Sequence, residues 1–209
     1  VKTETEDRYG RVGDEYDIVD QKISYVYRDN DKMLFPRMQD YSQGRPRLYK
    51  MWMGLDPNKP LPPGRPNMGD NLSFMARYQL GWMYWRYFIW NFAGRQNAQQ
   101  GFYPWDKSKG HWISGINFLD GMRLYNQSEI TEAMKNEQGR NRYYLLPFLF
   151  GLIGLIFHFR QNTHNAVGLL GLFVITGIGI IVYSNQPPNE PRERDYVLVG
   201  SIFTYCIWI

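Results

Sequence analysis

Three apolar runs near the end of the chain constrain its fold more than any other feature. Residues 143–159, 166–183 and 196–209 contain no Asp, Glu, Lys or Arg. At a rise of 1.5 Å per residue, a helix over the first run is about 25 Å long, near the lower limit for crossing a bilayer. The pattern predicts three membrane helices joined by short polar turns, the third of them truncated. We therefore expect a mainly α-helical, multi-pass membrane protein.

The charges and the single cysteine narrow the class of protein. Of the 24 Lys and Arg residues, only Arg160, Arg192 and Arg194 follow Tyr143, which indicates a polar segment followed by a membrane segment. Cys206 is the one cysteine, so neither a disulfide framework nor a zinc cluster is expected. The chain begins without Met and ends inside an apolar run, which we interpret as a fragment of a longer protein.

Residues 1–72 are expected to lie outside the membrane. Residues 16–20 and 22–28 carry β-branched and aromatic side chains in partial alternation, and 29–31 (D-N-D) is a turn signal. A β-hairpin with its return strand at 32–38 is therefore predicted. Residues 41–70 hold six prolines and several glycines, which favour an ordered loop.

Residues 73–142 form a second extramembrane segment. Residues 73–93 contain no proline and are aromatic on nearly all sides of a helix, which predicts a helix at the membrane interface. Arg77 and Arg86 make a transmembrane position costly. A loop follows, and 128–138 reads as a short helix. His111 stands without a matching histidine or carboxylate, so no metal site is predicted.

The loop between the second and third apolar runs is the strongest candidate for a functional site. Residues 185–196 (N-Q-P-P-N-E-P-R-E-R-D-Y) hold three prolines and five ionisable side chains. Charge held at a membrane surface by a stiff loop indicates function. The alternative is a solvated turn in which acids and arginines neutralise each other.

The chain also resembles a known family over nearly its whole length. The resemblance rests on F-P-R-M (35–38), Y-Q-L-G-W-M-Y-W-R-Y-F-I-W-N-F-A-G-R-Q-N (78–97), H-W-I-S-G-I (111–116), Y-Y-L-L-P-F-L-F-G-L-I-G-L (143–155) and the loop at 185–196. These runs are similar to the middle of a bacterial multi-pass membrane family (domain of unknown function 2723). That family is grouped with protein O-mannosyltransferases of the GT-C glycosyltransferase type.

The resemblance implies transfer of a sugar, mannose in the first instance, from a polyprenyl-phosphate donor to Ser or Thr of an acceptor protein. Arg192 and Arg194 would contact the donor phosphate, since a guanidinium binds phosphate through two parallel hydrogen bonds. Asp195 and Glu193 would orient them or act as an acid–base group. Weaker lipid or sugar contacts are Arg95, Trp85 and Trp90. The catalytic base is expected outside this chain.

The resemblance places the protein in the cytoplasmic (inner) membrane with its extramembrane segments on the extracytoplasmic side. Counting flanking arginines favours the opposite orientation. Two alternatives stay open: a lipid-binding or transport protein without catalysis, and a non-catalytic membrane scaffold. Nucleic-acid binding is not expected because acids are interspersed among the basic residues. Neither a cofactor nor a metal is expected.

Overall fold

The computed structural model describes residues 2–26, 29, 32–42, 44–190 and 195–209. They divide into two compact units, residues 1–36 and residues 37–209, which are described separately. The first unit is a two-stranded antiparallel ribbon, and the second is built of helices and loops.

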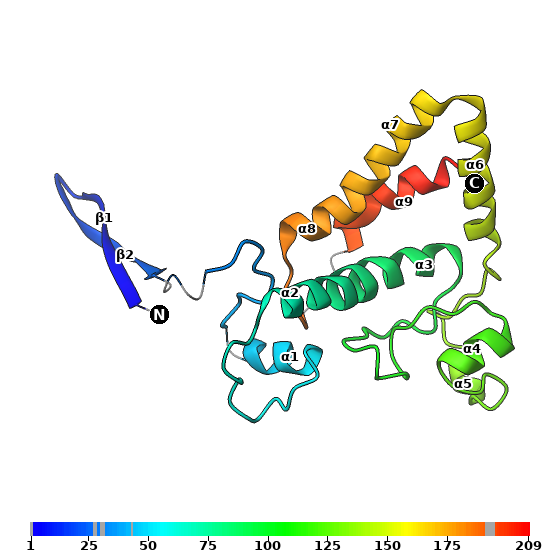
Figure 1. Cartoon of the computed structure of the whole chain (residues 1–209), viewed down its shortest axis with the longest axis horizontal. Coiled ribbons are helices and arrows are strands. Elements are labelled where there is room, and N and C mark those ends of the chain that lie inside the picture. Colours follow the sequence, from blue (N-terminus) through cyan, green and yellow to red (C-terminus); the bar gives the residue numbers. More distant parts are fainter. Residues whose placement is uncertain (1, 27–28, 30–31, 43, 191–194) are drawn as a thin grey trace. The chain divides into compact units, whose positions relative to one another are not determined.

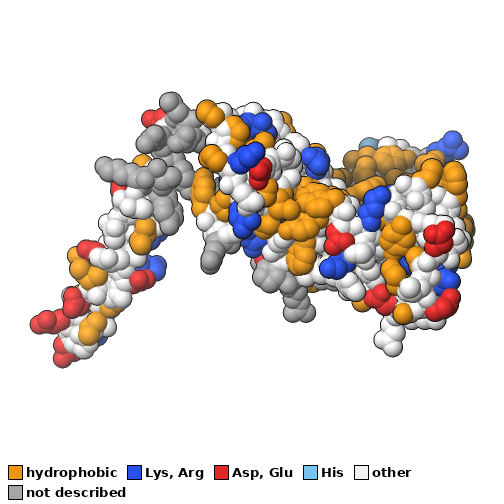
Figure 2. All heavy atoms as spheres, turned by 90° about the horizontal axis from the view of Figure 1, so that it is seen from below, with side chains coloured by type: hydrophobic (Ala, Val, Ile, Leu, Met, Phe, Trp, Pro, Cys, Tyr) orange, Lys and Arg blue, Asp and Glu red, His pale blue; other side chains and the backbone are white. Residues whose placement is uncertain are grey.

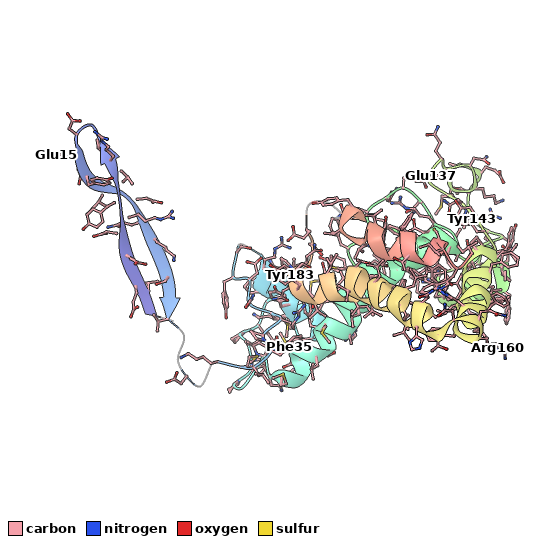
Figure 3. The ribbon with its side chains drawn as sticks, turned by 90° about the horizontal axis from the view of Figure 1, so that it is seen from above. Glu15, Phe35, Glu137, Tyr143, Arg160 and Tyr183 are labelled. Atoms are coloured by element: carbon pink, nitrogen blue, oxygen red, sulfur yellow. The ribbon has the colours of Figure 1, made fainter. Side chains whose placement is uncertain are left out.

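The ribbon pairs β1 (Lys2–Val12) with β2 (Glu15–Val26) (Figure 1). Its turn lies at Gly13, where φ is +68°, and Asp14, so Glu15 marks the tip of the ribbon in Figure 3. A hairpin is thus present, but its predicted bounds are wrong. A two-residue connection needs positive φ, which Gly13 adopts without strain. Residues 16–26 consequently form one strand, and the described residues of 32–38 form none.

In the second unit a Pro-rich loop surrounds α1 (Arg45–Trp52) and leads into one long helix. That helix runs through α2 (Met68–Phe74), the π-helical segment η2 (Met75–Trp85) and α3 (Arg86–Phe92). The Asn67 side chain accepts from the Asp70 amide and the Asp70 carboxylate accepts from the Asn67 amide, a reciprocal cap that fixes the start. The predicted aromatic helix is present and begins five residues earlier than expected.

The loops after this helix contain two short helices, α4 (Asn117–Arg123) and α5 (Glu132–Lys135). The predicted helix over 128–138 is only α5, because Thr131 rather than Ser128 accepts the capping hydrogen bond. An isolated β-bridge joins Arg95 to Trp112 and ties the two sides of this loop region together.

The first apolar run forms α6 (Leu146–Gln161). The second forms one continuous helix made of α7 (Thr163–Val174), η3 (Ile175–Gly179) and α8 (Ile180–Ser184). The third forms η4 (Asp195–Leu198) followed by α9 (Val199–Cys206). Figure 3 shows α6 between Tyr143 and Arg160, and the continuous helix between Arg160 and Tyr183.

The expectation of a multi-pass membrane protein is wrong for this structure. In the described part of the chain, one helix, Thr163–Ser184, is long and apolar enough to cross a membrane. Leu146–Gln161 and Tyr196–Cys206 are shorter. The first of these cannot begin at 143, because Tyr144 and Leu145 have φ values of 55° and 61°, outside the helical region, directly before Leu146 and Pro147.

Aromatic side chains fill the core of the second unit. One cluster joins α1 to the aromatic helix through Trp52, Phe74 and Tyr78, and another joins α3 to α9 through Phe88 and Tyr205. The glycines of the long apolar helix differ in their surroundings: Gly168 and Gly171 face open space in this unit. Gly177 permits close packing, since a Cβ there would lie 2.5 Å from the Tyr84 hydroxyl.

Candidate functional site

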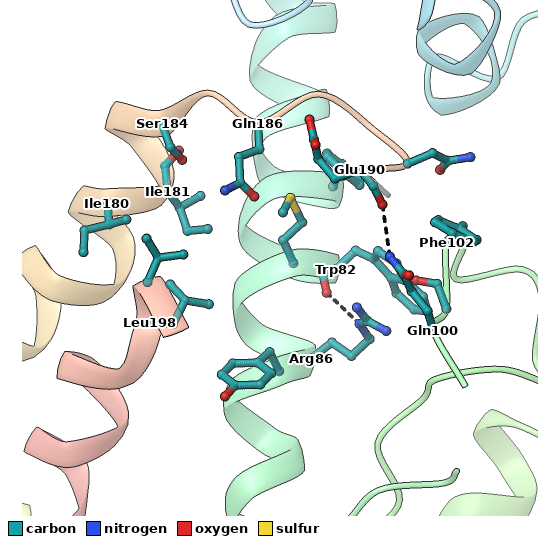
Figure 4. A pocket seen from close by; sticks show the side chains of 16 residues that line it. Trp82, Arg86, Gln100, Phe102, Ile180, Ile181, Ser184, Gln186, Glu190 and Leu198 are labelled. Atoms are coloured by element: carbon teal, nitrogen blue, oxygen red, sulfur yellow. Dashed lines mark hydrogen bonds between the residues drawn. The ribbon is translucent and has the colours of Figure 1, made fainter. Parts of the chain in front are cut away.

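A cavity of about 60 Å³ lies where the aromatic helix, α8, η4 and the loop at 100–102 meet (Figure 4). We call it the Arg86 cavity. A water needs roughly 10–15 Å³ of such space, so the cavity has room for a few waters or one group the size of a phosphate. Its lining comprises Tyr78, Trp82, Met83, Arg86, Tyr87, Gln100, Gly101, Phe102, Ile180, Ile181, Ser184, Gln186, Asn189, Glu190, Val197 and Leu198.

Arg86 is the buried cation of this cavity. Its guanidinium carbon lies 4.3 Å from the centroid of the Trp82 ring and 4.4 Å from that of Trp90. Nε donates to the Trp82 carbonyl at 2.9 Å and Nη1 donates to the Gly110 carbonyl at 2.7 Å. The three side chains share one side of the helix because they are four residues apart, and cation–π contact favours a partly desolvated guanidinium. The charge is therefore held in a fixed orientation.

The other walls of the cavity differ in polarity. Ile180, Ile181 and Leu198 form an apolar side, seen at the left of Figure 4. On the opposite side, the Gln100 amide donates to the Glu190 carbonyl oxygen at 3.1 Å. The Glu190 carboxylate lies 3.6 Å from Nη2 of Arg45. A ligand with an apolar portion and a polar end would match this division.

Hydrogen bonds attach the first part of the 185–190 loop to the aromatic helix. The Tyr78 hydroxyl donates to the Pro187 carbonyl at 2.9 Å. The Gln79 amide donates to Oδ1 of Asn185 at 3.0 Å and to the Gln186 carbonyl at 3.1 Å. Burial raises the pKa of the Tyr78 hydroxyl well above its ordinary value, so Tyr78 is a neutral donor. These bonds hold one edge of the cavity in place.

Arg37 stabilises the same edge of the Arg86 cavity through hydrogen bonds to Gln79 and to the end of α8. Its Nε donates to Oε1 of Gln79 at 2.8 Å, and its Nη atoms donate to the Val182 carbonyl at 2.8 Å and the Ile181 carbonyl at 3.2 Å. The last carbonyls of a helix have no partner within the helix, so a cation placed there satisfies them. Arg37 therefore links the end of α8 to Gln79.

The predicted phosphate contacts Arg192 and Arg194 lie outside the described residues, as does Glu193. Asp195 begins η4, and its side chain is not described. The predicted roles of these four residues stay predictions. Glu190 and Val197, which precede and follow these four residues in the sequence, both line the Arg86 cavity.

The weaker candidates Arg95, Trp85 and Trp90 are not brought together in the cavity. Trp90 is buried, and the Arg95 guanidinium stacks on it at 4.4 Å while donating to the Ala98 carbonyl at 3.3 Å. Trp85 is 47% exposed and stacks on Phe88 at 5.3 Å. Trp90 contributes indirectly, because its other contact is the Arg86 guanidinium.

The sequence interpretation missed Arg86, Gln79 and Arg37 as parts of a site. A signal was present: a charged and an amide side chain within an otherwise aromatic helix are costly to bury unless each is paired. Only the fold could supply the pairing, because Gln79 and its loop partners are separated by more than 100 residues.

The structure gives His111 a packing role. Its ring lies 4.9 Å from that of Trp82, edge to face, and Nε2 is 3.0 Å from the Asp106 carbonyl oxygen. Burial lowers the pKa of His111 to about 4. Among the described residues, no group of three or more His, Cys, Asp or Glu side chains is placed to hold a metal ion.

Comparison with known protein families gives a match to the first part of the chain. Residues 1–76 match the profile of a family of unknown function, DUF8416, so the match covers the ribbon, α1 and the first turns of the aromatic helix. No curated protein and no solved structure matches the chain.

Proposed function

We propose that this chain works at a membrane surface, where it binds the phosphate of a lipid-linked sugar and takes part in transferring that sugar to a protein. The observation that carries the proposal is the apolar surface of the helix Thr163–Ser184. Only 17% of its most apolar window is buried, and Ile175 at its middle is 67% exposed. Apolar surface of this extent marks an interaction with lipid or protein. Its length of 22 residues suits a lipid bilayer.

The neighbouring helices extend this surface. On α6, Leu149, Ile153 and Phe157 are exposed, and on α9 the exposed apolar side chains are Val199 and Phe203. Figure 2 shows apolar side chains lying among both basic and acidic side chains on the face of the second unit that it views. Membrane binding would therefore rest on the apolar helices.

The Arg86 cavity would hold the lipid phosphate. It lies beside Ser184, at the end of the long apolar helix, where a headgroup would meet the protein if that helix enters the bilayer. Arg86 supplies a desolvated guanidinium, which binds phosphate more strongly than a solvated one. Glu190 carries the opposite charge, and Arg45 lies 3.6 Å from its carboxylate.

The reaction we propose is glycosyl transfer from a polyprenyl-phosphate sugar to Ser or Thr on the extracytoplasmic side of the inner membrane. The resemblance of residues 78–97 and 185–196 to the O-mannosyltransferase-like family supports it. The bond between the sugar C1 and the phosphate oxygen breaks, and a bond from C1 to the acceptor Oγ forms. The hydroxyl proton passes to a base, and Arg192 and Arg194 would stabilise the departing polyprenyl phosphate.

Membrane binding is tested by flotation with vesicles of anionic and zwitterionic lipids. Replacing Ile175 with Asp places a charge on the apolar helix and should reduce the floated fraction at least tenfold, because a carboxylate at the centre of a membrane helix costs about 3 kcal/mol. Ile116→Asp is the matched control, since Ile116 is exposed outside the apolar helices, and it should float like the wild type. Equal flotation of the two variants would contradict the proposal.

Transfer is tested with the intact protein, including any sequence that flanks this chain. A labelled polyprenyl-phosphate sugar and a Ser/Thr-containing acceptor are incubated with wild type, Arg86→Met and an Arg192→Ala/Arg194→Ala double variant. We expect loss of transfer in both variants, with unchanged flotation. Donor binding without transfer in the wild type would favour a lipid-binding protein. Neither binding nor transfer, with retained flotation, would favour a membrane scaffold.

A further inference from the structure

The two faces of the ribbon formed by β1 and β2 differ sharply in chemistry. The register pairs Tyr9 with Ile18 and Thr5 with Ile23, so these side chains share one face with Tyr16. The opposite face carries five acids and two bases among its described side chains (Glu4, Glu6, Glu15, Asp17, Asp20, Arg8 and Lys22), together with the exposed side chains of Val12, Val19 and Val26. The first face therefore gathers the large aromatic and aliphatic side chains, and the second is mainly acidic.

Among the described residues of the first unit, none covers the apolar face. Tyr9 is 66% exposed, Tyr16 77% and Ile23 59%. An isolated two-stranded ribbon is marginally stable in water, and it needs either more strands or a surface packed on its apolar face. Large exposed apolar side chains aligned on one face of a sheet mark an interaction site.

We infer that the apolar face of the ribbon binds the same face of a second copy of this chain. The argument is the placement of the two charges on that face. Asp7 and Arg11 lie on it two residues to either side of Tyr9. A two-fold axis crossing the ribbon at the Tyr9–Ile18 pair reverses the strand direction, so Asp7 of each copy lies opposite Arg11 of the other. Such an interface is self-complementary, as a two-fold dimer requires.

Asp7 and Arg11 each have a partner within the ribbon that can be exchanged for one across the dimer interface. Asp7 accepts from the Gln21 amide at 2.8 Å, across the ribbon. Arg11 contacts Asp14 at 3.1 Å, and both side chains of that ion pair are largely exposed. An exposed ion pair contributes little to stability, so exchanging it for one at a partly dry interface costs little. The acidic face remains in water on both outer sides of the dimer.

The register of the dimer makes a charge-exchange experiment decisive. The mass of the full chain in detergent is measured by light scattering or sedimentation over a range of concentrations. We expect a dimer for the wild type. Asp7→Arg should weaken dimerisation at least tenfold by opposing two arginines, and Arg11→Asp should weaken it similarly. The Asp7→Arg/Arg11→Asp double variant restores opposite charges and should return to the wild-type dissociation constant.

Two further variants test the apolar contact. Ile18→Asp should give a monomer, whereas Val12→Asp, a similar change on the acidic face, should leave the dimer intact. A monomeric wild type at all concentrations would overturn the inference and point to another partner for the face, including the rest of this chain. A double charge variant no better than the single ones would refute the two-fold register. Because mass is measured without lipid donor, failure here leaves the proposed function untouched, and the reverse also holds.

Discussion

Gln79 offers the sharpest test of how the loop at 185–190 is held. Its side chain is completely buried, with 0% exposure. It accepts a hydrogen bond from Arg37 and donates two, to Asn185 and Gln186. Replacement by Leu, which has nearly the same volume, removes all three hydrogen bonds, so the Arg37, Asn185 and Gln186 groups that made them stay buried without those bonds. Loss of packing volume contributes little, so the measured effect reports on the polar contacts.

The magnitude follows from the kind of bond lost. A hydrogen bond to a charged group contributes about 1.5–3 kcal/mol and each of the two neutral ones about 1 kcal/mol, so Gln79→Leu should lower the free energy of unfolding by about 3.5–5 kcal/mol. Urea unfolding in detergent, followed by tryptophan fluorescence, measures it. Gln99→Leu changes an exposed glutamine and should stay within about 0.5 kcal/mol of the wild type.

A double-variant cycle shows whether the contact with Arg37 is responsible. Arg37→Met alone should be destabilising, because it also removes the partners of the Ile181 and Val182 carbonyls. The losses in unfolding free energy of the two single variants, added together, should exceed the loss in the Arg37→Met/Gln79→Leu double variant by at least 1 kcal/mol. The reason is that each single variant already loses the hydrogen bond between the two residues. Strict additivity, or a loss below about 1 kcal/mol for Gln79→Leu, would refute the reasoning.

Two further outcomes are expected. Gly177→Ala should destabilise the protein by about 1–3 kcal/mol, because the added Cβ would lie 2.5 Å from the Tyr84 hydroxyl. Gly168→Ala meets open space and should stabilise the protein by up to about 1 kcal/mol. Equal effects of the two variants in thermal unfolding would contradict this packing. Burial lowers the pKa of His111 to about 4 in the folded protein, below the ordinary histidine value of 6.5. Unfolding therefore takes up a proton between these two pH values, and the stability present above pH 6.5 falls as the pH drops towards 4. His111→Gln should flatten that part of the pH profile, and an unchanged slope would show that other groups cause it.

Local sequence signals determined several parts of this protein. The absence of proline and the helical spacing of aromatic residues over 73–93 predicted the helix that forms the centre of the second unit. The proline content of 41–70 predicted an ordered loop, and the segment departs from this at α1, where Pro46 occupies the first turn, and at the start of α2. Alternating β-branched residues predicted strand residues within β2, but neither its partner β1 nor the turn at Gly13 and Asp14. Such features depend on neighbours in the chain, so the sequence alone suffices to find them.

Tertiary structure decided what those signals left open. Hydrophobicity indicated three spanning helices, but the backbone at Tyr144 and Leu145 shortens the first, and the last begins as one turn of 3₁₀-helix. Composition indicated a site at the charges of 185–196 and not at Arg86. The two Trp neighbours and the carbonyl partners of Arg86 come together only on folding. The physical reason is range: periodicity records contacts within a few turns, whereas burying Arg86 and Gln79 requires partners supplied by distant segments.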